Sequence, residues 1–289
     1  MDNKQSLMIV DGMSLLFRGF YATASRGYIM KTRSGLPTNA VYGFIKYLWD
    51  AMNTFKPTHL LCCWDMGNKT FRNDLYSEYK ANRMAPPPEL VPQFELVKDV
   101  VASLDIPNVG MEGFEADDCI GTLVRMCSDK IYIQILTGDA DSLQLINERT
   151  ESILMKRGMS HYKVYTPEKL YQEKRLRPRQ IIDLKGLMGD ASDCYPGVKG
   201  IGEKTALKLL YEYDTVDNIL ANLSSLPKGI RHKIEAHFDM LQLSLQLAEI
   251  RCDVPIQLNL ADCKITINKQ KMQQQFEKLE FHHLFAQIS

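Results

Sequence analysis

The sequence predicts an α/β fold with a helical region after it. From Leu7 to about Val164, short apolar runs that are typical of buried strands alternate with segments whose apolar residues recur at helical spacing. Beyond that point, helical spacing continues alone to about Arg251. We therefore expect a central, mostly parallel sheet in residues 1–170 and a helical region in residues 171–289.

Four apolar runs are expected to form the parallel strands. Strands of a parallel sheet are buried on both faces, so their sequences are continuous apolar runs rather than alternating ones. One run is shorter and weaker than the others. In chain order the runs are Leu7–Val10, Leu60–Trp64, the weak Ile106–Val109 and Ile131–Leu136.

Two amphipathic helices are expected between these strands. Ala40–Met52 has apolar residues at helical spacing and follows Pro37-Thr38-Asn39, which we interpret as an N-terminal cap. Asp118–Cys127 forms the second helix and is opened by Glu115-Ala116-Asp117-Asp118. Acids in a first turn face the positive end of the helix dipole, which offsets part of their mutual repulsion.

The segment 69–103 has a different character and is expected to be irregular or mobile. Pro86-Pro87-Pro88 prevents one continuous helix here. Basic residues stand beside aromatic ones before these prolines, as in Phe71-Arg72 and Tyr79-Lys80-Ala81-Asn82-Arg83. Aromatic rings stack on unpaired bases and cations bind phosphates, so this segment is a candidate contact for single-stranded nucleic acid.

Nine acidic residues in five short runs are candidate metal ligands. Four of the runs lie at or just after the expected strands, and the carboxyl ends of parallel strands meet at one edge of a sheet. Two unit charges about 5 Å apart repel by roughly 3 kcal/mol at an effective dielectric of about 20, so such a cluster requires protons or cations. Carboxylate oxygens are the ligands that Mg²⁺ and Mn²⁺ prefer over Zn²⁺, and we expect two or more such ions here. The residues are Asp11, Asp65, Glu115, Asp117, Asp118, Asp139, Asp141, Asp190 and Asp193.

The helical region contains a candidate duplex-binding element at about 180–212. Its Gly200-Ile201-Gly202 sequence opens a helix, where backbone N–H groups can approach a phosphate directly. Residues 174–208 include eight basic and four acidic residues, which is a positive patch on a chain whose formal net charge is zero. The candidate DNA contacts of this element are Lys199, Gly200, Gly202, Lys204 and Thr205.

The composition excludes several classes of protein. Of the 289 residues 45% are apolar, yet no stretch approaches the roughly 20 apolar residues of a membrane span. The N-terminus has one basic residue before the first strand and does not resemble a signal peptide. The seven cysteines show no CxxC spacing, which favours reduced thiols in a cytoplasmic protein.

Taken together, these motifs resemble the 5′-nuclease family, which comprises flap endonucleases and the N-terminal exonuclease domain of bacterial DNA polymerase I. The resemblance covers essentially the whole chain and depends on five ordered motifs at family-like spacing, each of which would be weak alone. The motifs are Val10-Asp11-Gly12 with Leu16-Phe17-Arg18, Tyr79-Lys80-Ala81-Asn82-Arg83, Glu115-Ala116-Asp117-Asp118, Thr137-Gly138-Asp139-Ala140-Asp141 and the run Gly189–Ala206.

The resemblance implies a Rossmann-like (PIN-like) sheet, a helical arch at about 69–103 and a helix–three-turn–helix that binds duplex DNA. Lys80 and Arg83 would stabilise the charge that develops on the scissile phosphate. Arg18, Arg72 and Tyr79 would contact DNA.

The resemblance also divides the acids between two metal ions. One group would serve mainly the first ion and comprises Asp11, Asp65, Glu115 and Asp117. The other group would serve the second ion and comprises Asp118, Asp139, Asp141, Asp190 and Asp193. In the family a K⁺ ion often binds backbone carbonyls of the helix–three-turn–helix, which here would include that of Val198. Gly197 stands where some relatives supply a hydroxyl ligand.

We therefore expect a stand-alone bacterial 5′-3′ exonuclease and structure-specific 5′-flap endonuclease. It would act on flaps, nicked or gapped duplex and RNA primer ends in replication and repair, as a nucleoid-associated, cytoplasmic monomer. One rival interpretation is a non-catalytic protein of the same fold that binds branched DNA, which loss of two or more carboxylates would favour. Another is a PIN-like ribonuclease, which needs fewer acids and lacks the Gly197–Ala206 element.

Overall fold

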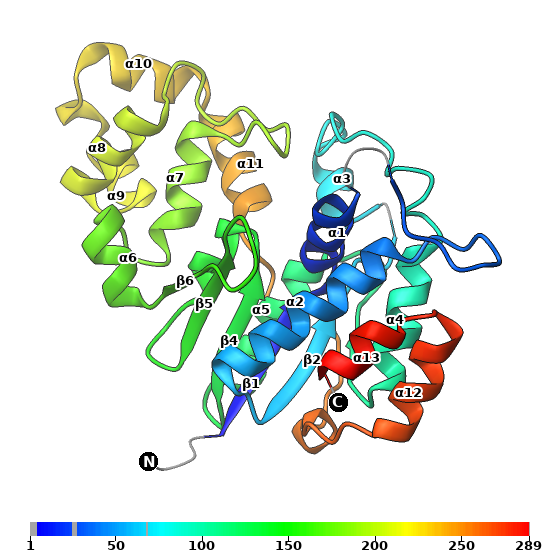
Figure 1. Ribbon diagram of the computed structural model, residues 1–289. Coiled ribbons are helices and arrows are strands. Elements are labelled where there is room, and N and C mark those ends of the chain that lie inside the picture. The colour runs from blue at the N-terminus through cyan, green and yellow to red at the C-terminus, as the bar shows by residue number, and fades with distance from the viewer. Residues whose placement is uncertain (1–4, 25–27, 68, 289) are drawn as a thin grey trace.

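The computed structural model describes residues 5–24, 28–67 and 69–288, which form a central sheet flanked by helices (Figure 1). The strand order is β3-β2-β1-β4-β5-β6, and all neighbours are parallel except β5 and β6. The expected mostly parallel sheet is therefore confirmed, although the weak run contributes only a two-residue strand. The strands are β1 Ser6–Asp11, β2 His59–Cys63, β3 Asn108–Val109, β4 Tyr132–Thr137, β5 Thr150–Met155 and β6 Tyr162–Tyr165.

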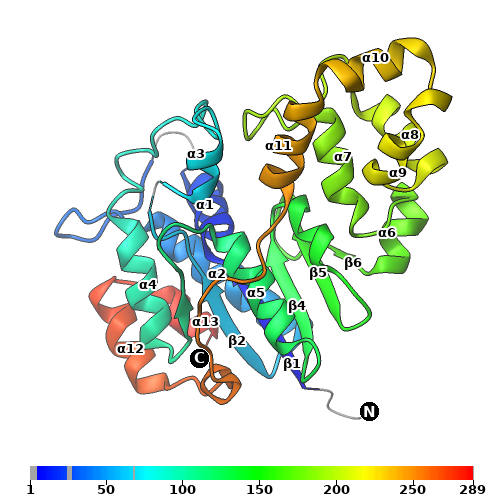
Figure 2. The same cartoon turned by 180° about the vertical axis from the view of Figure 1, so that it is seen from behind.

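Helices cover both faces of this sheet, which explains why the strand sequences are continuous apolar runs. Met8 and Val10 of β1 pack with α1, α2 and α4 on one face, whereas Leu7 and Ile9 pack with α5 on the other. The two faces are seen in Figures 1 and 2. Both predicted helices are confirmed with slightly wider bounds. The helices are α1 Gly12–Thr23, α2 Asn39–Phe55, α3 Phe71–Leu75, α4 Gln93–Ser103, α5 Ala116–Cys127 and the short 3-10 helix η2 Ala140–Leu145.

The helices of the helical region share a second hydrophobic cluster, which Leu154 of β5 and Tyr165 of β6 also join. Helix α7 packs against α11, where Gly186 leaves room for the side chain of Leu245, and α8 packs against α7. No helix among the described residues is long and apolar enough to cross a membrane. The elements are α6 Pro167–Lys174, α7 Gln180–Met188, α8 Glu203–Tyr213, α9 Val216–Ala221, η3 Leu223–Ser225, α10 Lys228–Ala236 and α11 Phe238–Ala248.

The last part of the chain packs on the α/β part and not on the other helices of residues 171–289. After α11 the chain returns to the α/β part, where the backbone N–H of Ile265 donates to Thr58 O at 3.1 Å. Met272 and Phe276 then join the same core as α2 and α4. These apolar side chains carry the C-terminal helices back to the sheet. The returning elements are η4 Leu260–Cys263, α12 Lys269–Lys278 and α13 His282–Ile288.

The segment 69–103 is only partly irregular. It begins with the short helix α3, continues as turns and extended chain through the three prolines, and ends in α4. Val97, Val100 and Val101 of α4 are fully buried in the core beside α2. The prediction of an irregular segment therefore holds for residues 76–92 and fails for the regular helix α4 that follows. From here on, the arch means residues 76–92 and not the whole range 69–103.

Candidate metal centre and nucleic-acid interface

Two of the acids come directly from strand ends. Asp11 is the last residue of β1 and also the N-cap of α1, because its carboxylate accepts the backbone N–H of Ser14 at 2.9 Å. Its second oxygen accepts the hydroxyl of Thr137, the last residue of β4, at 2.7 Å. Asp65 follows β2 and accepts the backbone N–H of Ala116 at 2.7 Å. These bonds fix both carboxylates at the carboxyl edge of the sheet.

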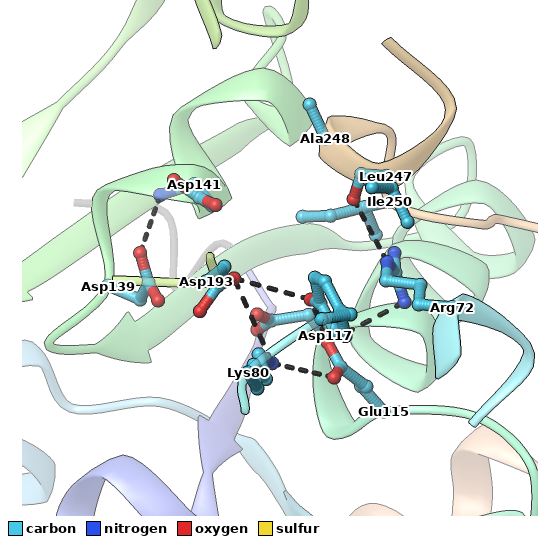
Figure 3. A pocket seen from close by; sticks show the side chains of 11 residues that line it. Arg72, Lys80, Glu115, Asp117, Asp139, Asp141, Asp193, Leu247, Ala248 and Ile250 are labelled. Carbon is cyan, nitrogen blue, oxygen red and sulfur yellow. Dashed lines mark hydrogen bonds and ion pairs between the residues drawn. The ribbon is translucent and has the colours of Figure 1, made fainter. Parts of the chain in front are cut away.

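The next acids come from a helix start and from the end of β4. Glu115 is the N-cap of α5, and Asp117 lies in the first turn of that helix. Asp139 follows β4 and caps η2, because it accepts the backbone N–H of Asp141 at 2.9 Å. Figure 3 shows Asp117, Asp139 and Asp141 around one small cavity that is also lined by Lys80 and Asp193.

The last acids reach this edge through a tight loop of the helical region. The backbone groups of Asp190 and Tyr195 pair with each other, at 2.8 and 3.1 Å. At the base of the loop Gly189 (φ 74°) and Gly197 (φ 60°) face each other so closely that a Cβ on either would overlap the backbone opposite. Only glycine satisfies both restrictions, so this pair closes the loop and places Asp190 and Asp193 over the sheet edge.

Burial and mutual repulsion disfavour the charged forms of several acids in this cluster. Burial, opposed by hydrogen bonds from Ser14 and Thr137 and reinforced by nearby acids, raises the pKa of Asp11 to about 6. Burial and Asp139 raise the pKa of Asp141 to about 6 despite a nearby lysine. Burial, together with Asp11 and Asp139, raises the pKa of Asp117 well above its usual value. This is the electrostatic signature of carboxylates that converge on a shared cation site.

Lys185 also belongs to this cluster, although its sequence position indicates only a member of the basic patch of residues 174–208. Its ammonium pairs with Asp141 and with Asp190, the latter at 2.5 Å. Burial disfavours the charge of Asp190, but hydrogen bonds from Lys185 and Ser192 outweigh it and lower the pKa of Asp190 to about 2. The residue lies on α7, five positions before Asp190, and that spacing alone does not distinguish it from a surface lysine.

The arch brings its own cations to the acids. The ammonium of Lys80 donates to Glu115 at 2.6 Å, and its backbone N–H donates to Asp193 O at 3.0 Å. Arg83 pairs with the Asp193 carboxylate at 3.0 Å. The two residues predicted to act on the scissile phosphate thus lie at the acid cluster. Their catalytic role stays a prediction.

The prediction that Tyr79 contacts DNA by ring stacking is not supported by its position. The ring is 4% exposed and stacks on Tyr195, with centroids 6.5 Å apart. Its hydroxyl lies 3.2 Å from both Glu115 and Asp193. Tyr79 is therefore a buried contact between the arch and the acids Glu115 and Asp193. An aromatic residue beside basic ones in the sequence is compatible with both this packing and base stacking, so the sequence could not distinguish them.

The structure contradicts two further predictions, a DNA contact at Arg72 and a metal ligand at Asp118. Arg72 is 2% exposed and Asp118 is 0% exposed. The guanidinium makes two parallel bonds to the Asp118 carboxylate, at 2.7 and 2.9 Å, and donates to the carbonyls of Leu247 and Glu249. Asp118 also accepts the backbone N–H of Arg251 at 2.8 Å. The pair is a buried structural link between α3, α5 and the end of α11.

The other predicted DNA contacts lie on the surface or are partly engaged. Lys199, Gly200, Gly202 and Lys204 are exposed and Thr205 is partly exposed, in the loop and first turn of α8. Arg18 donates to the carbonyls of Met155 and Lys156, at 2.8 and 2.7 Å. The Val198 carbonyl accepts the N–H of Ile201 at 2.9 Å. DNA binding by these residues and K⁺ binding at Val198 stay predictions.

The residues present fit a hard divalent cation. Asp141, Asp190 and Asp193 each offer a carboxylate oxygen, and the three oxygens lie within 4.8 Å of one another. The donors gathered at this edge are carboxylate oxygens, the ligand type that Mg²⁺ and Mn²⁺ prefer over Zn²⁺. The pKa values of Asp11 and Asp141 are raised by burial and by neighbouring acids, and a bound cation would favour the charged forms of both.

Comparisons with known proteins agree with this site. Residues 6–175 match the family model of the 5′-3′ exonuclease N-terminal resolvase-like domain, and residues 176–273 match the 5′-3′ exonuclease C-terminal SAM fold. A 5′-3′ exonuclease of Bacillus subtilis (strain 168) is 51% identical over 98% of this chain and 94% of its own. DNA polymerase I of Bacillus caldotenax is 39% identical over 99% of this chain, which spans 32% of that polymerase.

A solved structure shares the fold at lower sequence identity. The complex of bacteriophage T5 flap endonuclease with DNA and metal ions has a TM-score of 0.71 and 22% identity, and the match covers 96% of this chain and 100% of that one. The relative at 51% identity and the two family matches establish the family. The chain therefore belongs to the 5′-3′ exonuclease family of nucleases.

Proposed function

We propose that the protein hydrolyses DNA from 5′ ends and cuts 5′ flaps, with Mg²⁺ or Mn²⁺ as its metal. The observation that carries this proposal is the convergence of eight carboxylates beside the arch cations Lys80 and Arg83 at one sheet edge. The eight are Asp11, Asp65, Glu115, Asp117, Asp139, Asp141, Asp190 and Asp193. The likeness to the T5 flap endonuclease supports the fold, and flap cleavage by this chain is part of the proposal.

We propose that the carboxylates serve two ions. Asp141, Asp190 and Asp193 would hold one ion, and Asp11, Asp65, Glu115 and Asp117 another, with Asp139 between the groups. When bound, such ions activate water and stabilise charge on the attacking and leaving oxygens of a phosphodiester. We assign Asp118 to neither group because it is fully buried and both of its oxygens accept bonds from Arg72.

The basic residues of the cluster have a second task in this proposal. Lys80, Arg83 and Lys185 neutralise acids in the structure, and all three can turn to the phosphate once cations occupy those acids. A cation that is held in place where negative charge grows in the transition state contributes about 10²–10³ in rate. Lys80→Ala and Arg83→Ala should therefore lower the turnover of bound substrate more than its affinity.

The helical region would hold the duplex part of the substrate. Lys199 lies in the loop before α8 and Lys204 lies in the first turn of this 11-residue helix, whose N-cap is Gly202. Gly202 is exposed, and a Cβ built on it would meet no atom within 4 Å, so a phosphate has room to approach the N-terminus of α8. One chain carries every acid of the cluster, and we propose that it acts as a monomer.

The test is cleavage of a 5′-flap duplex in Mg²⁺, with and without a chelator, and with the 5′ end or the flap base labelled. We expect products from the flap base and the 5′ end that the chelator abolishes. Binding of the flap without cleavage in either Mg²⁺ or Mn²⁺ would instead favour the branched-DNA binding protein. Equal cleavage of single-stranded RNA would favour the PIN-like ribonuclease.

A further inference from the structure

Gln93 is a buried amide at the point where the arch ends and α4 begins. It is 0% exposed and is the first residue of α4. Its side-chain oxygen accepts the backbone N–H groups of Ala40 and Val41, at 2.7 and 3.2 Å. Its side-chain nitrogen donates to the Glu89 carbonyl of the arch at 2.9 Å and to the Asn39 side-chain oxygen at 2.9 Å.

These partners leave the amide one possible orientation. The N–H groups of Ala40 and Val41 can only donate and the carbonyl of Glu89 can only accept, so the oxygen must face α2 and the nitrogen the arch. All four hydrogen-bonding positions of the amide are then occupied. Gln93 replaces the local cap that α2 lacks, because the N-cap Thr38 makes no side-chain cap bond.

The network continues from Gln93 to the helix that carries Asp11. Asn39 is also 0% exposed and donates to Thr23 Oγ1 at 3.1 Å, and Thr23 in turn donates to the carbonyls at the end of α1. Helices α1 and α2 touch backbone to backbone, since a Cβ on Gly19 would lie 2.6 Å from Ala40 O. The other end of this rigid pair is Asp11, the N-cap of α1.

We infer that Gln93 is a positioning residue for the proposed reaction. It ties the C-terminal root of the arch to the α1–α2 pair, and thereby sets where Lys80 and Arg83 meet the acids. The N-terminal end of the arch is held separately, because Arg72 of α3 pairs with Asp118. With both roots held, residues 76–92 can rearrange around a 5′ strand and still return Lys80 to one place. This inference rests on the proposed function, since it assigns Gln93 its effect through Lys80.

Gln93→Glu separates the tether from the cap. A carboxylate still accepts from Ala40 and Val41, and its charge is favoured at the positive end of α2. It cannot donate to Glu89 or to the Asn39 side chain, so those two bonds are lost, while both bonds that cap α2 remain. Gln93→Met removes both the bonds that cap α2 and the bonds to Glu89 and Asn39. Gln180→Met is the matched control, because Gln180 is likewise a buried first residue of a helix, whose amide donates to Asp214 O at 2.7 Å.

The first readout is tryptic cleavage after Lys80 and Arg83 in DNA-free protein. We expect Gln93→Glu to increase the cleavage rate at these two sites several-fold, and Gln180→Met to leave it unchanged at both. Because this readout needs neither metal nor substrate, it stands whether or not the enzyme is active. An unchanged rate of tryptic cleavage in Gln93→Glu would overturn the claim that Gln93 holds the arch to helices α1 and α2.

The second readout is a double-mutant cycle on the single-turnover rate with saturating enzyme. Gln93→Glu alone should lower that rate by about 10-fold or more, because a misplacement of about 1 Å can cost 10²-fold. In a Lys80→Ala background the same change should have little further effect, whereas Gln180→Met should act independently of Lys80. If Gln93→Glu lowered the single-turnover rate by the same factor with and without Lys80→Ala, the inference would be overturned and the proposed function would remain intact. No effect of Lys80→Ala itself would overturn both.

Discussion

The corrected role of Arg72 gives the sharpest stability prediction. Arg72→Met keeps most of the length of the side chain and removes its charge and all its hydrogen bonds. Asp118, at 0% exposure, would then hold a buried carboxylate without a cation, and the carbonyls of Leu247 and Glu249 would each lose a donor. Removing one partner of a buried pair typically destabilises by about 3–5 kcal/mol. We expect the free energy of unfolding to fall by that amount.

The hydrogen bonds that Asp118 keeps reduce the expected destabilisation by Arg72→Met. Asp118 still accepts from the backbone N–H groups of Glu115 and Arg251, at 3.0 and 2.8 Å, so the lower end of the range is the better expectation. Arg72→Met with Asp118→Leu removes the orphaned charge together with its partner. That double variant should therefore be more stable than Arg72→Met alone.

The assay is urea unfolding of the metal-free protein, followed by circular dichroism, with Arg83→Met as the control. Arg83 is a largely exposed arginine of the same segment, and its ion pair with Asp193 should contribute less than about 1 kcal/mol. The reasoning would be refuted if Arg72→Met were no less stable than Arg83→Met.

Three further predictions concern the site. Asp190→Asn should abolish cleavage but keep or tighten DNA binding, since it removes negative charge near the phosphates; a parallel loss of gel-shift affinity would contradict it. Lys204→Ala should weaken binding to duplex-containing substrates and lower the salt dependence by about one phosphate contact, with single-strand binding as the control. The raised pKa of Asp11 and of Asp141, about 6 each, means that the folded state binds more protons than the unfolded state between about pH 4 and 6. Metal-free protein should therefore lose stability as pH rises through that window, and saturating Mg²⁺ should remove the loss; a metal-free melting temperature that rises from pH 4.5 to 6.5 would contradict this.

The sheet and most of the acid cluster were predictable because both follow from local sequence. A continuous apolar run indicates a strand buried on both faces, and an acid that follows it must lie at the carboxyl edge. Asp11 and Asp65 are placed by this rule alone. The Asp190 loop was predictable in part, because Gly189 and Gly197 mark its turns, although its approach to the sheet edge was suggested only by the family resemblance.

The errors come from contacts between residues far apart in the chain. Arg72 and Asp118 are 46 residues apart, and nothing local to either sequence shows that each is the other's buried partner. Similarly, the cap of α2 comes from Gln93, 53 residues from Ala40, and not from the adjacent threonine. Charge and aromatic patterns identify residue types that suit DNA, but they do not show which of them face solvent.

The return of α12 and α13 to the sheet was missed for a similar reason. Helical spacing shows that Met272 and Phe276 share one face of a helix, but not which core that face joins. Their partners belong to α2 and α4, more than half the chain away. The assignment of residues 171–289 to one region therefore followed helix content, whereas the packing follows the apolar face.

The central claim is that these carboxylates bind divalent cations, and anomalous diffraction from crystals soaked in Mn²⁺ tests it most directly. We predict ions in two places, one between Asp141, Asp190 and Asp193 and one bound by Asp11 and Asp117, with Lys185 displaced from its two acids. Asp118 should remain on Arg72 and bind no ion. A cluster that stays free of Mn²⁺ at saturating concentration, with Lys185 still paired, would contradict the account.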